Sequence, residues 1–192
     1  MTLDRSGIRE TEDDTRPARR PRSRGSSWSR WSRWWKVGEP RAPRRTVISA
    51  SVTTSVALTV LVTVGTLTHQ TVLIPPLAAT TAIITVTPGS PLAQPRHVLG
   101  GHLLSCLVCF TVLALGWHGP WAAALACGAA CGLGLLFKVA HPPAMATVVM
   151  IMLNEPRAIP FTALLATGAT LLVLVQLISS RLQREVYPTT WW

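Results

Sequence analysis

The stretch HPPAMATVVMIMLNEP (residues 141–156) decides the fold. It begins with a histidine and two prolines, continues through apolar residues, and reaches its first charged residue at Glu155. A helix needs roughly 20 apolar residues to cross a bilayer, so this stretch is much shorter than an ordinary membrane span. It is also too apolar for an exposed loop. We therefore expect a short helix within a larger apolar structure.

The charged residues around this stretch are distributed very unevenly. The chain has 192 residues and a net charge of +10, and 13 of its 18 Lys and Arg residues lie in positions 1–45. Four long runs contain no Asp, Glu, Lys or Arg: 46–95, 97–137, 139–154 and 158–180. They also lack the polar face of a soluble helix. The pattern predicts an all-α, polytopic helical membrane protein.

Prolines and glycines divide the apolar part into four long helices and two short ones. We expect long spans at 46–68, 98–116, 121–139 and 161–180. The short helices are expected to start at Pro75-Pro76 and Pro142-Pro143, because proline is tolerated in the first turn of a helix. The predicted parts are a disordered basic cytoplasmic tail (1–45), a transmembrane domain (46–182) and a C-terminal tail (183–192).

The two short segments resemble each other. PPLAATTAIITV (75–86) and PPAMATVVMIML (142–153) share five identities in twelve positions. Each lies between two long spans, so the chain reads as a possible internal repeat, 46–117 and 121–180. Paired short segments interrupted by proline are typical of the binding sites of transporters.

Two membrane topologies fit this pattern. Six crossings place these residues on the side of the basic tail, as the positive-inside rule favours: Arg96, Lys138, Arg181 and Arg184. Four crossings with two re-entrant half-helices fit the short lengths better. Both topologies place both termini in the cytoplasm.

The starts of the short helices are the candidate binding site, because the free N–H groups of a helix N-terminus attract anions. The substrate-binding candidates there are His141, Pro142, Pro143 and Thr147 on one helix, and Pro75, Pro76 and Thr80 on the other. His141 either carries a proton with the anion or only caps its helix. Flanking candidates are Arg96, Gly100, Gly101 and His102, although Arg96 is also consistent with a simple cytoplasmic loop.

The basic tail contains SSWSRWSRWWK (residues 26–36). On a helix, its tryptophans and its cations lie on opposite sides, which is typical of a segment lying at the membrane interface. We expect it to contact anionic lipid head groups. Nucleic acid is the less favoured partner, because the first membrane span makes lipid the nearer anion.

Other chemistry has little support. Four cysteines lie in apolar runs without neighbouring carboxylates, so we interpret them as packing residues and expect no metal or cofactor: Cys106, Cys109, Cys127 and Cys131. The only acid in the apolar part is Glu155, so we expect no enzyme. A face of small residues with Gly128 and Gly132 is a candidate homo-oligomer contact.

SPLAQPRHVLGGHLLS (90–105) and HPPAMAT (141–147) resemble the signatures of the HPP family of integral membrane proteins, over about residues 70–182. This resemblance implies four membrane spans, and therefore re-entrant short segments. It also implies a link to nitrite, since plant members are associated with nitrite transport into chloroplasts. The family usually has two glycines where this chain has Ala144 and Met145, and Met145 narrows the room for a ligand.

The leading interpretation is a plasma-membrane permease for a small inorganic anion such as nitrite. The alternative is a non-transporting membrane scaffold or anchor that acts through the basic, Trp-rich tail.

Overall fold

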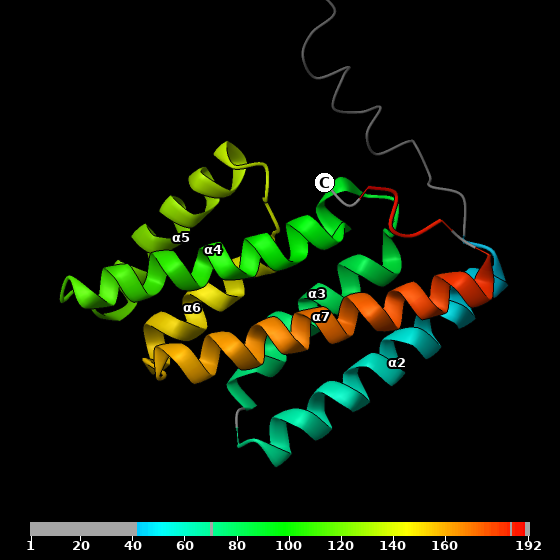
Figure 1. Cartoon of the computed structure of the whole chain (residues 1–192), viewed down its shortest axis with the longest axis horizontal. Coiled ribbons are helices and arrows are strands. Elements are labelled where there is room, and N and C mark those ends of the chain that lie inside the picture. Colours follow the sequence, from blue (N-terminus) through cyan, green and yellow to red (C-terminus); the bar gives the residue numbers. More distant parts are fainter. Residues whose placement is uncertain (1–41, 70, 185, 191–192) are drawn as a thin grey trace, which may run out of the picture. The chain divides into compact units, whose positions relative to one another are not determined.

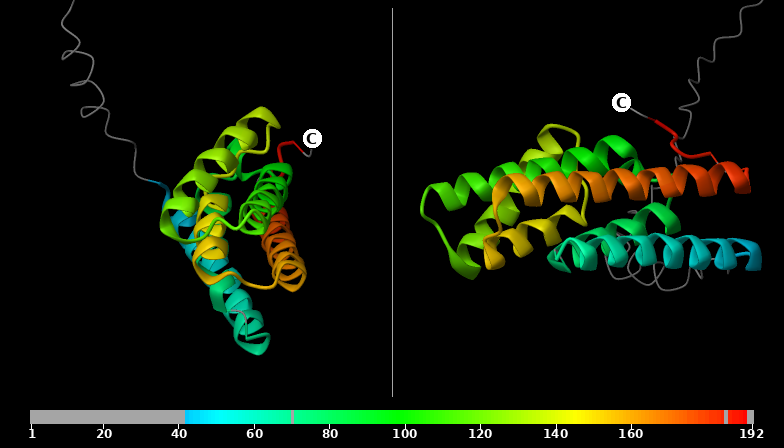
Figure 2. Two further views of the ribbon diagram at one scale, coloured as in Figure 1. Left: turned by 90° about the vertical axis from the view of Figure 1, so that its left-hand side faces the viewer. Right: turned by 60° about the horizontal axis from the view of Figure 1, so that its bottom comes forward.

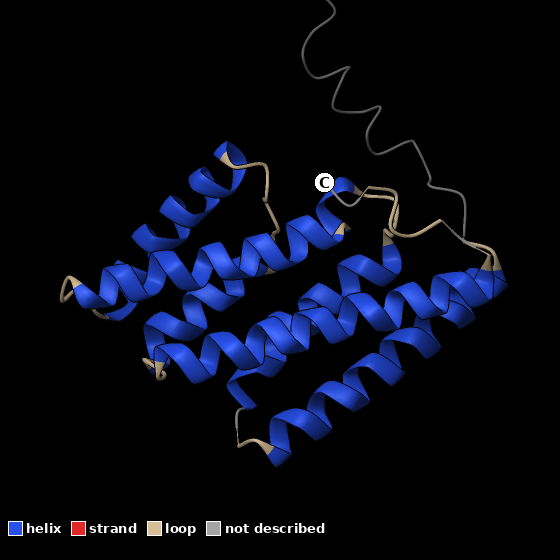
Figure 3. Ribbon diagram, viewed as in Figure 1, coloured by secondary structure: helices blue, strands red, loops and turns tan. Residues whose placement is uncertain are grey.

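The structure, a computed structural model, describes residues 42–69, 71–184 and 186–190. The Trp-rich segment 26–36 lies outside these residues. All regular elements of the described part are helices (Figure 3). Four are long and apolar enough to cross a membrane: α2 (Arg44–Leu67), α4 (Pro95–Ala114), α5 (Gly119–Leu136) and α7 (Ala158–Gln183). Two are short and apolar: α3 (Ile74–Val86) and α6 (Ala144–Asn154). The predicted pattern of long and short helices is therefore confirmed.

Prolines set the starts of the helices, as expected. Pro75 and Pro76 lie in the first turn of α3, and Pro95 is the first residue of α4. Proline fixes φ near its helical value and lacks only an N–H group that has no partner at this position. Pro142 and Pro143 immediately precede α6.

Contacts at the helix ends show that successive helices run in opposite directions. Thr53 near the start of α2 bonds Ser179 near the end of α7, at 2.7 Å. Thr54 bonds Thr85 at the end of α3, at 3.0 Å. Figures 1 and 2 show the same arrangement, with α7 running beside α2 in the opposite direction. The first and last long helices are therefore antiparallel, and so are α2 and α3.

The remaining helices continue this alternation. Arg96, at the start of α4, donates to the carbonyl of Phe137 at the end of α5, at 3.2 Å. At the other end of the bundle, His118 lies 2.7 Å from the carboxylate of Glu155, which follows α6. Each short helix therefore returns the chain across the bundle. In the bundle α2 and α4 consequently run parallel (Figure 1), which is the direction that six crossings require and two re-entrant segments do not.

The two halves of the chain pack in equivalent ways. The short helix α3 packs against α2 of its own half and α7 of the other, while α6 packs against α5 and α4. Close approach at glycine accompanies both contacts between halves. A Cβ atom at Gly168 of α7 would lie 2.6 Å from Leu77 of α3, and one at Gly101 of α4 would lie 2.6 Å from His141 before α6. The fold is therefore an inverted repeat whose two short helices meet near the middle.

Candidate functional site

A cluster of four buried polar side chains lies where the two short helices meet α4. We call it the His–Thr cluster: Thr80, His102, His141 and Thr147. Each is at most 2% exposed. The two imidazole rings meet edge to face with centroids 5.2 Å apart. All four belong to the predicted set of site residues, and α3, α4 and the approach to α6 bring them together.

Hydrogen bonds join the cluster into one chain. Thr147 Oγ1 lies 2.8 Å from Nδ1 of His102, and Nε2 of His102 lies 2.8 Å from Thr80 Oγ1. Thr80 Oγ1 lies 3.1 Å from Nε2 of His141, whose Nδ1 lies 2.9 Å from the carbonyl of Leu92. Buried polar groups need such partners, because each unpaired one costs about 1–3 kcal/mol. This series of hydrogen bonds gives a partner to both ring nitrogens of each histidine.

One arrangement of hydrogens satisfies every hydrogen bond of the cluster when both rings are neutral. The Leu92 carbonyl only accepts, so Nδ1 of His141 carries the hydrogen and Nε2 accepts one from Thr80. Thr80 then accepts from Nε2–H of His102, and Nδ1 of His102 accepts from the Thr147 hydroxyl. Thr80 Oγ1 also lies 3.0 Å from the Pro76 carbonyl. Its single hydrogen therefore has a choice between Pro76 and His141.

The two threonines occupy equivalent places in the repeat. Aligning Pro75-Pro76 with Pro142-Pro143 pairs Thr80 with Thr147. In both copies the second proline is buried and the first is exposed. His102 lies between the two threonines and bonds both of them. The cluster therefore lies on the contact between the two halves, the position that holds binding sites in transporters built from inverted repeats.

The start of α6 differs from the anion site expected from the sequence. The N–H groups of Ala144, Met145 and Ala146 donate to the carbonyls of the three residues from His141 to Pro143, at 2.9–3.1 Å. The two prolines carry no N–H group. The first turn is thus closed by its own backbone, and these donors are occupied. The polar groups near this helix start are side chains of the His–Thr cluster.

The remaining predicted residues contribute packing and capping. Gly101 allows close approach to His141, and Gly100 allows close approach to Val139. Arg96 donates to the carbonyl of Phe137, the residue that caps the C-terminal end of α5, where a cation interacts favourably with the helix dipole. Arg96, Gly100 and Gly101 therefore all lie against the segment 137–141.

A cavity of about 280 Å³ touches the cluster at His141. It lies between α4, α5 and the start of α6, and its lining is mostly apolar. Gly101, Cys131, Pro142 and Met145 contribute to its wall. Met145 thus lies beside His141 in the space where the family usually has glycine.

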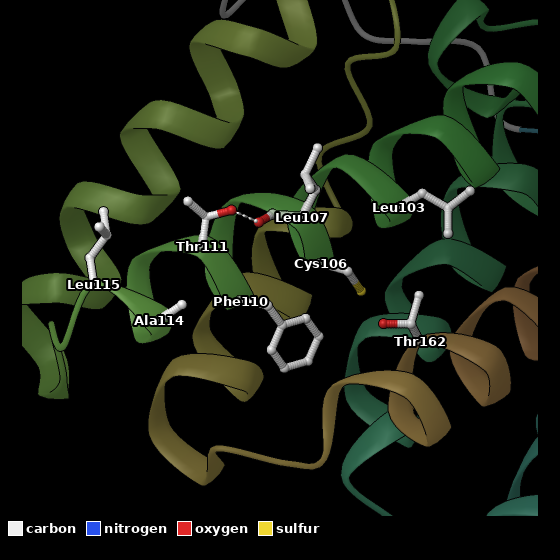
Figure 4. A pocket seen from close by; sticks show the side chains of 8 residues that line it. All are labelled: Leu103, Cys106, Leu107, Phe110, Thr111, Ala114, Leu115 and Thr162. Atoms are coloured by element: carbon white, nitrogen blue, oxygen red, sulfur yellow. Dashed lines mark hydrogen bonds between the residues drawn. The ribbon is translucent and has the colours of Figure 1, made fainter.

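A second hollow lies apart from the cluster. It is a groove of about 550 Å³ along the outer side of α4, with Thr162 of α7 at its edge (Figure 4). Figure 4 shows the sulfur of Cys106 turned toward Thr162. Cys109 and Cys127 each lie 3.8 Å from a backbone carbonyl of α6, those of Val148 and Met145. Within the described residues, no three His, Cys, Asp or Glu side chains come together as a metal site.

The sequence did not reveal that the C-terminal segment braces the site. Tyr187 is buried and donates its hydroxyl to the carbonyl of Ala93, at 3.1 Å. Gln94 accepts from the N–H of Thr189, at 2.9 Å. The braced loop also contains Leu92, whose carbonyl holds His141. Burial raises the pKa of the Tyr187 hydroxyl, which therefore stays a neutral donor at physiological pH.

The family model described as "HPP, transmembrane region" matches residues 39–188. The chain belongs to the HPP family of transmembrane proteins. The match extends the resemblance, seen in sequence motifs from about residue 70, back over the first long helix. It contains every member of the His–Thr cluster and Tyr187.

Two transmembrane proteins of Dictyostelium discoideum are similar to this HPP protein. One is 32% identical over 130 residues, which cover 63% of this chain and 46% of the relative. The other is 32% identical over 124 residues, which cover 60% of this chain and 40% of the relative. The chain thus spans less than half the length of these curated relatives. No solved structure gives a significant match.

Proposed function

We propose that this HPP protein is a permease for a small inorganic anion, with the His–Thr cluster as its binding site. The observation that carries the proposal is the position of this cluster. It is a buried, polar, titratable group of side chains between two inverted repeats, in a chain whose other helical surfaces are largely apolar. Ionisable residues at such a depth are costly and typically serve transport.

The chemistry of the cluster suits an anion. Imidazole N–H and threonine O–H groups are donors, and an imidazole becomes a cation when it binds a proton. Ser105, one turn after His102 on α4, has a buried hydroxyl without a partner among the described residues. It offers one more donor on the buried side of α4. Nitrite is the first candidate, because plant members of the family are associated with its transport.

The orientation in the membrane belongs to the same proposal. The end of the bundle that holds the start of α2 also holds Arg96, Lys138 and Arg181, whereas Arg157 lies at the opposite end next to Glu155. Positively charged loops favour the cytoplasm. We therefore place both termini on the cytoplasmic side of the plasma membrane.

Uptake into proteoliposomes tests this function. Purified protein would be reconstituted, and nitrite and nitrate entry measured for the wild type, His141→Ala and His118→Ala. His118 is an exposed histidine paired with Glu155 outside the cluster, so its variant is the matched control. We expect saturable uptake that His141→Ala loses and His118→Ala keeps. No uptake above empty liposomes, with protein of normal elution and melting behaviour, would refute the permease.

A further inference from the structure

We propose that each anion crosses together with one proton, and that the Thr80 hydroxyl switches the site between its empty and loaded states. This inference rests on the proposed function and names its coupling ion. It is carried by the Thr80 hydroxyl, which lies within hydrogen-bond distance of two histidines and a backbone carbonyl.

The first setting of the switch is the empty site. Both rings are neutral, and the Thr80 hydrogen points to Nε2 of His141, which lies 3.1 Å away. In the second setting, a proton from water has bound at Nε2 of His141. The Thr80 hydroxyl then turns its hydrogen to the Pro76 carbonyl, 3.0 Å away, and accepts from His141. Nδ1–H of His141 stays on the Leu92 carbonyl in both settings.

Both settings keep the buried donors and acceptors paired. In the second setting, the Thr80 oxygen accepts from Nε2–H of both His102 and His141, which uses its two lone pairs. The proton leaves when the Nε2–H bond of His141 breaks and the proton returns to water on the far side. The anion is not changed chemically. His102 keeps its Thr147 partner throughout.

The charges around the cluster explain why proton and anion would bind together. Residues 46–154 contain no acid, so within this stretch a protonated His141 has no carboxylate to compensate its charge. A bare anion in the same place has no fixed cation in the middle of a helix, since the charged residues of the helices lie in first or last turns. Either charge alone is costly to bury, by several kcal/mol, and together they offset each other. Binding of one therefore favours binding of the other.

The other titratable groups near His141 include cations but no carboxylate. By sequence, α3, α6 and the loop with Leu92 contain none. The titratable and charged groups of the two helices that line the cavity around His141 are Arg96, His97, His102, Cys106 and Cys109 on α4, and Cys127, Cys131 and Lys138 on or after α5. His97 bonds the Ala140 carbonyl at 2.9 Å, and Arg96 bonds that of Phe137.

The first test measures charge and protons together with the anion. Proteoliposomes would contain a pH-sensitive dye, with potassium and valinomycin setting the membrane potential. Nitrite would be added outside. Nitrate would be tested in parallel, because nitric acid, unlike nitrous acid, does not cross the bilayer as a neutral molecule. Empty liposomes give the background from nitrous acid. We expect anion entry with acidification of the interior, at a rate independent of membrane potential.

The alternative results are distinct. Anion entry that follows the membrane potential without acidification would overturn the proton-coupling inference but leave the permease intact. No entry of either anion would refute the permease itself, and the inference with it.

Variants of two neighbouring threonines test the switch. Thr80→Val removes the hydroxyl at nearly constant shape, and Thr80→Ser keeps it. Thr81→Val is the matched control, because Thr81 is equally buried but its hydroxyl bonds only the Leu77 carbonyl of its own helix, at 2.9 Å. We expect Thr80→Val to lower proton-coupled uptake on the order of tenfold, the effect of a lost buried hydrogen bond, while the other two keep it.

The ratio of protons to anions separates a switch from a structural role. If Thr80→Val keeps coupled uptake, or if Thr80→Val and Thr81→Val lose it equally, the switch is refuted. Uptake in Thr80→Val that continues with fewer protons per anion would support it directly.

Discussion

A single hydrogen atom at Gly101 determines how closely α4 approaches His141. Glycine is needed there for space, because an added Cβ would lie 2.6 Å from the Cβ of His141 and 3.0 Å from the carbonyl oxygen of Val139. Neither is the end of a flexible side chain, so one of the two segments would have to move. The position of the imidazole ring thus depends on a residue without a side chain.

Gly101→Ala is expected to displace His141 from Thr80. Overpacking of this kind costs about 1–3 kcal/mol, so the melting temperature in detergent should fall by several degrees and anion uptake should largely disappear. Gly89→Ala is the control, because no atom beyond its neighbours in the sequence lies within 4 Å of a Cβ at Gly89. Equal melting temperatures and uptake for the two variants would show that close approach at Gly101 is not required.

Hydroxyl groups in the described residues differ in their partners, and the sequence alone does not show which partner each one has. Thr63 and Thr111, for example, donate to the carbonyl four residues earlier, at 2.8 Å each, which lets threonine lie in an apolar helix. Thr80 and Thr147 each bond His102 of another helix, and Thr80 also lies within hydrogen-bond distance of the Pro76 carbonyl. Composition shows only many threonines. The alignment of the two proline pairs is what selected Thr80 and Thr147 in advance.

At the scale of elements, the short helices are segments that carry the chain across the bundle. Their lengths alone favoured re-entrant half-helices, and the distribution of Lys and Arg favoured crossings. The parallel directions of α2 and α4 are those expected if the short helices cross, which is the topology that the distribution of Lys and Arg favours. A helix of 13 residues spans only about 20 Å, so the turn before α3 and the loop after it complete the path.

Cysteine labelling tests the path of α3 in a membrane. In a variant without the four native cysteines, Thr68→Cys and Gly89→Cys would place single thiols before and after α3. Both positions are exposed. We expect a membrane-impermeant maleimide to label them from opposite sides of the membrane, and a permeant one to label both from either side. Labelling of both from the same side would mean that α3 is re-entrant.

The C-terminal brace is the element that sequence reasoning missed. The sequence gives only a short polar stretch after α7, and a contact between Tyr187 and Ala93 depends on the folded bundle. The helices could be predicted because prolines and long charge-free runs are local signals. Hydrogen bonds between distant segments, and the occupied N–H groups at the start of α6, have no local signal.

Tyr187→Phe measures what this brace contributes. The variant keeps the aromatic ring and removes the hydroxyl that donates to Ala93, so the expected loss is about 1 kcal/mol. For a chain of this size that corresponds to a fall in melting temperature of roughly 2–4 °C. Differential scanning fluorimetry in detergent provides the measurement. An unchanged melting temperature would show that the hydroxyl bond adds no stability to the loop that holds His141.

At the scale of the whole molecule, the transport proposal and the basic tail are separable. All members of the His–Thr cluster lie between residues 80 and 147, and the described helices begin at Arg44. The tail carries the Trp-rich segment 26–36, for which we propose contact with anionic lipid head groups. Its role is therefore expected in membrane attachment and not in uptake.

Deletion of residues 1–40 distinguishes the two functions proposed for this chain. If the protein is a permease through its His–Thr cluster, the shortened protein should take up the anion at the same rate per molecule in proteoliposomes, and its melting temperature should not change. Substitution of Trp28, Trp31, Trp34 and Trp35 by Ala in the full chain is the matched variant, because it removes the apolar side of the tail and keeps its charge. Loss of uptake in the shortened protein, or uptake in neither form together with tail-dependent binding to anionic vesicles, would favour the scaffold function. The permease proposal requires the membrane domain to act without the tail.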